Sequence, residues 1–404
     1  MTAPFARKGQ PLMPQHLTAD TSIGERLAYW RQRRGKTQTV LAGLSGLSQA
    51  YISSIENGSR VVEKRSTLVA LASALQVSVA ELTGKPGDPT DPMRSRAVAH
   101  VPAIREALIR REMGYANGLP ALVGDVNSLT HAGQAYDFAA AAPMLPGLLL
   151  TCTGIDMVRT CQQGVAVLKY LGYSDLSRDA ANLGVTAARD LEDPAWVGVA
   201  EVNHVNSLPT ELGDVPVTVA SRAADEVQSS AGDPRVRQAY GMLHLHAAIR
   251  SATNRRPGDA LAHLDEAQQA ADSLGEPDDQ LGLAKLAFGP TNVGIWRLTV
   301  LREMGDTERA IEGAKEIVPE RIPLASRQAP FYLDLAQALA SSGKRDDEAV
   351  AAFLRAEAIA PQFVRLRPVV RDTIAAILYR TRRNAVSRPL RRAAELVGLQ
   401  GRLH

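Results

Sequence analysis

The amino-acid sequence predicts an all-α protein with two unequal domains. Ala, Leu, Arg and Glu dominate from residue 93 onward, and the apolar–polar alternation typical of strands is absent. A stretch rich in Pro and Gly at residues 85–93 cannot continue a helix and therefore marks a domain boundary. We expect a flexible arm at 1–21, a head at 22–84, a linker at 85–93 and a helical body at 94–404.

The composition excludes several classes of protein. Of the 404 residues, 45% are hydrophobic and 22% are charged, which is a globular balance. No stretch approaches the ~18 apolar residues that cross a membrane, and the first 20 residues lack an apolar signal core. Cys152 and Cys161 match no zinc or CxxC spacing. We therefore expect two reduced thiols in a cytoplasmic protein without a membrane partner.

The charge is distributed unevenly along the chain. Residues 22–85 hold nine basic and four acidic residues, whereas residues 86–360 hold 25 basic and 36 acidic residues. Residues 361–404 are basic again, with ten arginines and two acidic residues. A basic head on an acidic body fits one domain placed on phosphate and another kept away from it. The basic tail could contact phosphate or dock on the acidic body, and charge alone favours neither.

The first, fourth and fifth helices of the head are expected at residues 23–34, 66–75 and 79–82. Thr21 or Ser22 can cap the first of them, with Glu25 completing a capping box after Ser22. The loop between residues 59 and 65 carries cations just beyond the second helix of the motif described next. These cations could contact phosphates and fix the register on a duplex, or could belong to an ordinary solvated loop.

Residues 37–58 predict a helix-turn-helix. Gly46 lies between two short helical segments, where a positive φ costs glycine little. Ser48 can cap the second helix, and Gly58 after Asn57 can end it. The residues that this helix leaves facing outward are short or carry an amide, and none is negatively charged, which suits entry into a DNA major groove. They are Gln49, Ala50, Ser53 and Ser54.

This segment resembles the XRE-type (Cro-type) helix-turn-helix of the phage repressor superfamily. The similarity lies in Thr-Gln-x-x-Leu-Ala, a turn containing Gly, and Ser-x-x-x-Ile-Ser-x-Ile-Glu-x-Gly, and it extends over residues 23–82. It implies a five-helix head in which Arg31 pairs with Glu56. It also implies DNA contact by the glutamine that opens the second helix and by the first residues of the third. The expected DNA-binding residues are Gln38, Ser48, Gln49, Ala50, Tyr51, Ser53, Ser54, Arg60, Lys64 and Arg65.

The body shows a degenerate repeat of helix pairs. Gly-Asp or Gly-Lys turns at residues 257–259, 305–306 and 343–346 are each followed by an alanine on an amphipathic helix. The pattern resembles a tetratricopeptide-type α-solenoid, in which each hairpin buries one face on its neighbour. Single helices are expected, among others, at residues 145–171 and 279–304.

The whole arrangement resembles actinobacterial regulators with an XRE-type head and a tetratricopeptide-like body. It is also similar in architecture to peptide-sensing quorum regulators, which implies a sensor for a small-molecule or peptide effector. A ligand would meet polar groups on the concave face of the solenoid. Amides can bind an extended peptide, Arg297 could bind a carboxylate and Tyr332 could form an aromatic wall. The amide candidates are Asn203, Asn206 and Asn292, and for each candidate an interhelical hydrogen bond is the alternative.

The chain lacks recognisable catalytic motifs. We find no Gly-rich phosphate loop, no GxSxG and no HExxH. His244 and His246 are two residues apart and point away from each other on a helix, so they cannot share a metal. We therefore expect no enzyme, no cofactor and no metal.

The expected function is that of a transcriptional regulator associated with the nucleoid. One head reads a short half-site, so a homodimer on double-stranded DNA with a pseudo-palindromic operator is expected. The alternative is a DNA-tethered scaffold whose solenoid binds a partner protein.

Overall fold

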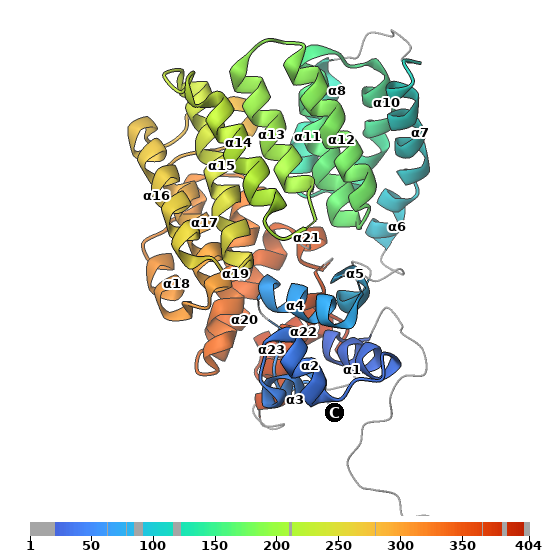
Figure 1. Cartoon of the computed structure of the whole chain (residues 1–404), viewed down its shortest axis with the longest axis vertical. Coiled ribbons are helices and arrows are strands. Elements are labelled where there is room, and N and C mark those ends of the chain that lie inside the picture. Colours follow the sequence, from blue (N-terminus) through green and yellow to red (C-terminus); the bar gives the residue numbers. More distant parts are fainter. Residues whose placement is uncertain are drawn as a thin grey trace, which may run out of the picture.

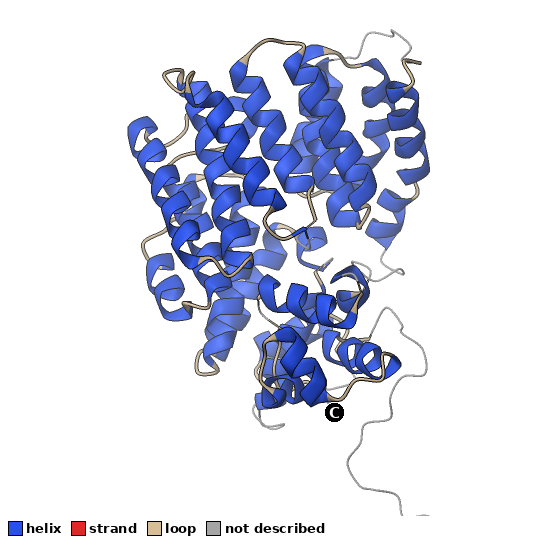
Figure 2. Cartoon of the chain, viewed as in Figure 1, coloured by secondary structure: helices blue, strands red, loops and turns tan. Residues whose placement is uncertain are grey.

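The computed structural model describes residues 21–62, 64–77, 79–84, 92–115, 123–209, 212–278, 280–365, 367–381 and 386–399. Within these residues the secondary structure is helical and no strand occurs (Figure 2). None of the helices in this part of the chain has the length and apolar character needed to span a membrane. The expected arm at 1–21, apart from Thr21, and most of the expected linker lie outside the described residues.

The head is a cluster of short helices around one small core. Its buried side chains include Leu27, Leu41, Ile52 and Leu71, which are less than 1% exposed and come from different helices. The five helices expected here are present, and their bounds are α1 Ile23–Arg33, α2 Gln38–Ser45, α3 Gln49–Glu56, α4 Arg65–Leu75 and α5 Val79–Thr83.

Local sequence explains how α2 and α3 form a helix-turn-helix. The hydroxyls of Thr37 and Ser48 accept hydrogen bonds from the backbone N–H groups of Val40 and Tyr51, so each helix is capped by its own N-cap residue. Gly46 ends α2 with φ 67°, a conformation that favours glycine. The turn at Gly46 and the cap at Ser48 therefore lie where the sequence predicts them, and the cap at Thr37 adds to them.

The body continues with helices from α6 to α23. Their bounds are α6 Pro92–Val98, α7 Val101–Glu112, α8 Val123–Gln134, α9 Phe138–Ala141, η1 Ala142–Met144, α10 Leu145–Thr151, α11 Gly154–Leu171, α12 Ser174–Arg189, α13 Pro194–Ser207, α14 Val215–Gln228, α15 Pro234–Thr253, α16 Pro257–Leu274, η3 Leu283–Lys285, α17 Pro290–Met304, α18 Thr307–Ala314, η4 Pro319–Arg321, α19 Ala325–Ser342, α20 Asp346–Ile359, α21 Pro361–Arg365, α22 Pro368–Arg380 and α23 Arg388–Leu396.

Successive helices from α11 to α20 form antiparallel hairpins that stack side by side (Figure 1). Helices α11, α13, α15, α17 and α19 contact one another in series, and we call them the inner layer. Their hairpin partners α12, α14, α16, α18 and α20 form the outer layer. Ala260, Ala310 and Ala349 are at most 1% exposed, because each lies at the close contact within a hairpin. The predicted fold class, an all-α head followed by a helical-repeat array, is confirmed.

The two ends of the array meet. Tyr136 stacks on Phe363 with ring centroids 4.4 Å apart, and Tyr170 packs edge-on against both rings. Gln362 donates to Asp137 Oδ1 (3.0 Å) and accepts from the backbone N–H of Phe138 (3.0 Å). One hydrophobic core accordingly includes residues from both ends of the body, between 97 and 181 and between 311 and 399.

The single helices expected at residues 145–171 and 279–304 are both interrupted. Residues 145–171 break between α10 and α11, where Cys152 has an extended backbone and Gly154 begins α11 with φ 55°. In the second segment, the α-helix α17 begins only at Pro290. Proline has no N–H to donate, so it fits best in the first turn of a helix. The single-helix predictions for these two segments are wrong.

The head lies against the end of the body where α17 and α22 meet it (Figure 1). Helix α4 contacts α15, and α1 contacts α22. The orientation of the head is therefore defined by contacts with specific body helices.

Candidate nucleic-acid interface and its attachment to the body

A chain of polar contacts links the head core to the surface of α3. Arg31 donates two hydrogen bonds to Glu56, from Nε to Oε1 (2.6 Å) and from Nη2 to Oε2 (2.8 Å), so the expected ion pair is present. Gln38 Nε2 donates to Glu56 Oε2 (2.8 Å), and Gln49 Nε2 donates to Gln38 Oε1 (2.8 Å).

The charge of Glu56 fixes how both amides are oriented. An ionised carboxylate only accepts hydrogen bonds, so the Gln38 NH₂ group faces it and the Gln38 oxygen faces outward. That oxygen in turn receives the NH₂ group of Gln49, whose own oxygen stays available. Gln49 is exposed at the start of α3. The arrangement can present an oriented amide to the edge of a base pair.

The remaining expected DNA-binding residues of α3 surround this amide. Ser48 and Ala50 are exposed, and Tyr51, Ser53 and Ser54 are partly exposed. The Arg60 guanidinium lies over the Tyr51 ring, 4.9 Å from its centroid, and the Ser54 hydroxyl donates to the Tyr51 carbonyl (2.7 Å). This stacking places a positive charge beside α3.

Lys64 and Arg65, which the sequence groups with Arg60 as phosphate contacts, lie at the contact with the body in this structure. Lys64 Nζ donates to the Met304 carbonyl at the end of α17 (3.2 Å). The backbone N–H groups of Arg65 and Ser66 donate to Glu303, to Oε2 (2.8 Å) and Oε1 (2.7 Å) respectively. Phosphate contact by either side chain stays a prediction, and it would require this contact to be rearranged.

Glu303 acts as the N-terminal cap of α4. The N-cap residue Lys64 offers no capping side chain, and the 2% exposed carboxylate of Glu303 binds the two first amides instead. Its negative charge also suits the positive end of the helix dipole. A residue of the body thus caps a helix of the head.

A second carboxylate joins the body to the first head helix. Asp372 Oδ2 of α22 accepts a hydrogen bond from the Ile23 N–H (3.3 Å), although Ser22 and Glu25 already form a capping box there. Burial lowers the pKa of Arg26 in the same helix, and the charges of Asp372 and Glu25 oppose this shift. The two carboxylates hold the head by the N-termini of α1 and α4.

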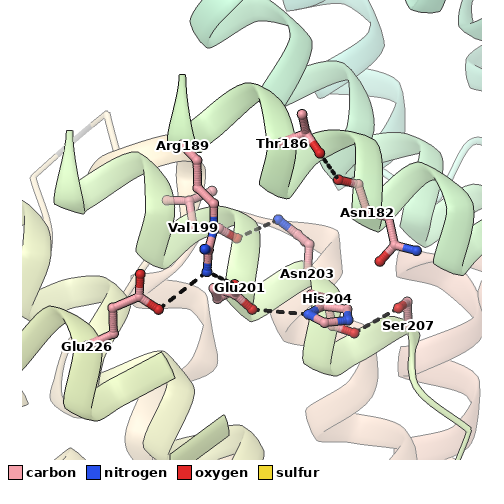
Figure 3. A network of polar contacts seen from close by, with 9 residues as sticks. All are labelled: Asn182, Thr186, Arg189, Val199, Glu201, Asn203, His204, Ser207 and Glu226. Carbon is pink, nitrogen blue, oxygen red and sulfur yellow. Dashed lines mark hydrogen bonds and ion pairs between the residues drawn. The ribbon is translucent and has the colours of Figure 1, made fainter. Parts of the chain in front are cut away.

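The amides expected to bind an effector lie in separate surroundings. Asn203 donates to the Val199 carbonyl of its own helix (2.8 Å) and lies beside the network of Arg189, Glu201 and His204 (Figure 3). Asn206, one turn later, accepts a hydrogen bond from Lys169. Asn292 is fully buried and donates to the Leu286 carbonyl (3.4 Å).

The network beside Asn203 is a set of ion pairs between hairpins. Glu201 is 6% exposed and contacts Arg189 (3.4 Å) and His204 (3.1 Å). Burial raises the pKa of Glu201, but the hydrogen bond and charge of His204, followed by those of Arg189, shift it below its usual value. Arg189 also reaches Glu226 of the next outer helix (Figure 3). The ion pairs of Arg189 thus join α12 to α13 and α14.

The other two expected ligand residues, Tyr332 and Arg297, lie on α19 and α17. Tyr332 hydrogen-bonds Glu320 of η4 and lies under Arg355 of α20, 5.7 Å from ring centroid to guanidinium, and is therefore engaged between layers. Arg297 is partly exposed on α17. Among the described residues, no hydrogen bond or ion pair joins any two of the five candidates, and effector binding by them stays a prediction.

Among the residues that the structure describes, no group of three or more His, Cys, Asp and Glu side chains is arranged so that it could hold a metal ion. The His244 and His263 rings are instead in contact with each other, with their Nδ1 atoms 3.0 Å apart.

Residues 22–83 match the protein family described as helix-turn-helix domain. Over 66 residues the chain is 46% identical to the HTH-type transcriptional repressor RghR of Bacillus subtilis (strain 168), an alignment that covers 16% of this chain and 49% of the repressor. The chain therefore matches about half the length of this relative. The family match assigns α1–α5 to a helix-turn-helix domain, and the similarity leaves most of the helical body uncovered.

Sequence reasoning missed Glu303 and Asp372. Both lie in helices far from the head along the chain, and an isolated Glu or Asp in a helix is an ordinary surface residue by pattern. The one available signal was the absence of a capping residue before α4, where Lys64 occupies the N-cap.

Proposed function

We propose that this protein is a sequence-specific DNA-binding transcriptional regulator whose helical body binds a small-molecule or peptide effector and alters operator binding. The observation that carries the DNA-binding part is the oriented amide of Gln49 on an exposed α3, held through Gln38 by the Arg31–Glu56 pair. Similarity of the head to part of a transcriptional repressor supports the same proposal.

A homodimer is part of this proposal. One recognition helix contacts only a few base pairs, so a single head would discriminate poorly among genomic sites. Two heads spaced by about 34 Å would meet the major groove on one side of the duplex and read a pseudo-palindromic operator. The body would supply the dimer contact.

The attachment of the head suggests how an effector could act. Glu303 and Asp372 hold the head through hydrogen bonds from different body helices, α17 and α22. A ligand that shifts these helices relative to each other would favour one head orientation over another. Its effect on operator binding is limited by the difference between its affinities for the two orientations.

The test is an anisotropy titration of the full chain against DNA upstream of its own gene and against random duplexes. Gln49→Ala should lower specific affinity by ~1–3 kcal/mol and alter base preference. Arg60→Ala should weaken binding to all sequences and lower the salt slope by about one contact. Gln32→Ala on the exposed surface of α1 is the matched control. Unchanged affinity and preference in Gln49→Ala would refute α3 as the recognition helix.

A further inference from the structure

Two cations of the inner layer converge on the C-terminal end of α13. Lys169 of α11 donates to the backbone oxygen and to the side-chain oxygen of Asn206 (2.8 and 2.6 Å). Arg250 of α15 donates to the carbonyls of Val205 and Leu208 (3.2 and 2.9 Å). Because these carbonyls belong to neighbouring residues, the two positive charges lie close together. The partial negative charge of the helix end attracts both cations.

Two more cations belong to the same region. Arg327 of α19 donates to the carbonyls of Leu286 (3.0 Å) and Ser326 (3.3 Å), and its Nε is buried with no hydrogen-bond partner. The Arg367 guanidinium lies over the Phe363 ring, 5.0 Å from its centroid. Among the described residues, no carboxylate forms an ion pair with Lys169, Arg327 or Arg367.

A cluster of rings connects these cations. Tyr170, which follows Lys169 in α11, packs on Phe363, the ring under Arg367. Tyr136, stacked on Phe363, donates its hydroxyl to the carbonyl of Ser326, which precedes Arg327.

Burial lowers the pKa of Lys169 well below its usual value, and the positive charges of Arg250, Arg65 and Arg367 lower it further. Burial likewise depresses the pKa of His246 on the neighbouring α15, followed by the charges of Arg250, Lys169 and Arg327. A shared positive field therefore extends over α11, α15 and α19.

The head contributes one of these charges. Arg65 begins α4, and its backbone amide is fixed by Glu303. Its side chain keeps contact with solvent, yet burial and then Arg367 lower its pKa, while the charge of Glu303 raises it. Arg65 is therefore an exposed cation of the head, next to the contact that its own backbone makes with the body.

Other arginines of the body are paired with carboxylates, for example Arg302 with Asp334 (3.2 Å) and Arg189 with Glu226 (3.4 Å). The body has a large excess of acidic residues between 86 and 360, so pairing partners are abundant in the sequence. Leaving several cations without them costs free energy in the ligand-free protein, and an added anion would recover that free energy.

We propose that the inner layer and the head together bind an organic anion that carries a carboxylate or phosphate group. The cations that would hold it are Lys169, Arg327, Arg367 and Arg65. Arginine forks match such groups with two parallel hydrogen bonds, and Lys169 adds a point charge. The partly exposed rings of Tyr170 and Trp296 lie on the same layer and can contact the organic part of the ligand.

This site deepens the proposed function and rests on it for its regulatory meaning. Arg65 belongs to the head, whereas the other three cations belong to the body. An anion that contacts both would add to the attachment made by Glu303 and Asp372. Ligand binding would thereby stabilise the head orientation seen here and change the population that is competent to bind DNA.

The test is calorimetric titration of the full chain with inorganic phosphate and, separately, with citrate, at ionic strength kept constant with chloride. We expect saturable binding of at least one probe, and the two arms separate phosphate from carboxylate ligands. Lys169→Gln and Arg327→Gln should each weaken binding at least tenfold, whereas Lys169→Arg should retain it. Arg178→Gln, an exposed arginine of the outer helix α12, is the matched control and should bind as the wild type does.

The contribution of the head is measured with Arg65→Gln. Weaker anion binding in this variant, with unchanged circular dichroism, would support a site shared by the head and the body. Absence of saturable binding of both probes to the wild type, or equal binding by wild type and Lys169→Gln, would overturn the proposal.

The same variants separate this inference from the proposed function. Specific DNA binding by a wild type that binds neither anion would refute the anion site and leave the regulator intact. Saturable, Lys169-dependent anion binding by a chain that binds no DNA specifically would retain the site and remove its role in transcription.

Discussion

The two sides of the head are stabilised by different parts of the chain. On the side of α2 and α3, Thr37 and Ser48 cap the helices from within, and the Arg31–Glu56 pair joins α1 to α3. On the opposite side, α4 begins without a capping side chain of its own and Glu303 of the body supplies one. The recognition side is therefore self-contained, whereas the docking side depends on the body.

Under the proposed function, this difference separates two tasks within one small domain, contact with DNA and response to the body. A surface that contacts DNA needs side chains whose positions do not change when the body moves, and local caps provide this. A surface that reports the state of the body must instead depend on it. Dependence on a buried carboxylate makes the docking side sensitive to small displacements, because hydrogen bonds weaken steeply with distance and angle.

The largest expected effect is on the recognition side. Glu56→Ala should destabilise the head by about 3 kcal/mol, because it leaves the nearly buried Arg31 guanidinium without its partner and Gln38 without its acceptor. The measurement is thermal denaturation followed by Trp30 fluorescence, in a background where Trp196 and Trp296 are replaced by phenylalanine.

A double variant tests the reason for that loss. Replacing both Arg31 and Glu56 by methionine removes the pair without leaving a buried charge, so it should be less destabilising than Glu56→Ala alone. A double variant as unstable as the single one would mean that the pair itself, and not the orphaned charge, dominates.

The body should add a pH dependence that the head lacks. Burial, then the charge of His263, lowers the pKa of His244 to about 4. The folded value is below the unfolded one, so this stabilisation is complete above pH 6.5 and is lost as the pH falls toward 4, by up to about 3 kcal/mol. His244→Gln should flatten the stability profile of the body between these values, whereas the exposed His131→Gln should not.

Residues 21–84 contain no histidine. Unfolding of the head, followed by Trp30, should therefore show a weaker pH dependence between 4 and 6.5 than unfolding of the body. Parallel profiles for the two domains would indicate that they unfold as one unit, and the proposed independence of the recognition side would then be wrong.

On the docking side, Glu303→Ala should cost about 1–2 kcal/mol of head stability through the lost cap. It should also accelerate proteolytic cleavage within residues 85–93, the expected linker, because the head is held less firmly. Glu308→Ala, an exposed residue of the next helix, is the control. Equal cleavage rates in the two variants would contradict the role assigned to Glu303.

The smallest expected effect sharpens the comparison. Ser48→Ala should cost about 1 kcal/mol, because it removes the cap of α3. If the two sides of the head are independent, the losses in Ser48→Ala and Glu303→Ala should add to within about 0.5 kcal/mol. A coupling free energy larger than this, measured in the double variant, would show that the contact with the body affects the stability of α3.

Local features of this protein were predictable from the sequence. The turn at Gly46, the caps at Thr37 and Ser48 and the hairpin turns at Gly305 and Gly343 depend on residues a few positions apart. Backbone conformation and capping act over that distance, so a pattern along the chain contains the necessary information. The Arg31–Glu56 pair was predictable only from the resemblance to a known family, because the spacing of residues along the chain does not indicate that these two side chains meet.

The tertiary structure decided which distant groups meet. Glu303 and Ser66 are 237 positions apart and Tyr136 and Phe363 are 227 apart, and no periodicity relates them. The candidate ligand residues were predicted from their residue types alone. In the structure Asn206 is hydrogen-bonded to Lys169, and Tyr332 is hydrogen-bonded to Glu320. The sequence determined the helices and their turns through local backbone energetics. The closure of the array, the cap from the body and the cluster of cations arose only when those helices packed, because each depends on side chains that share no local stretch of chain.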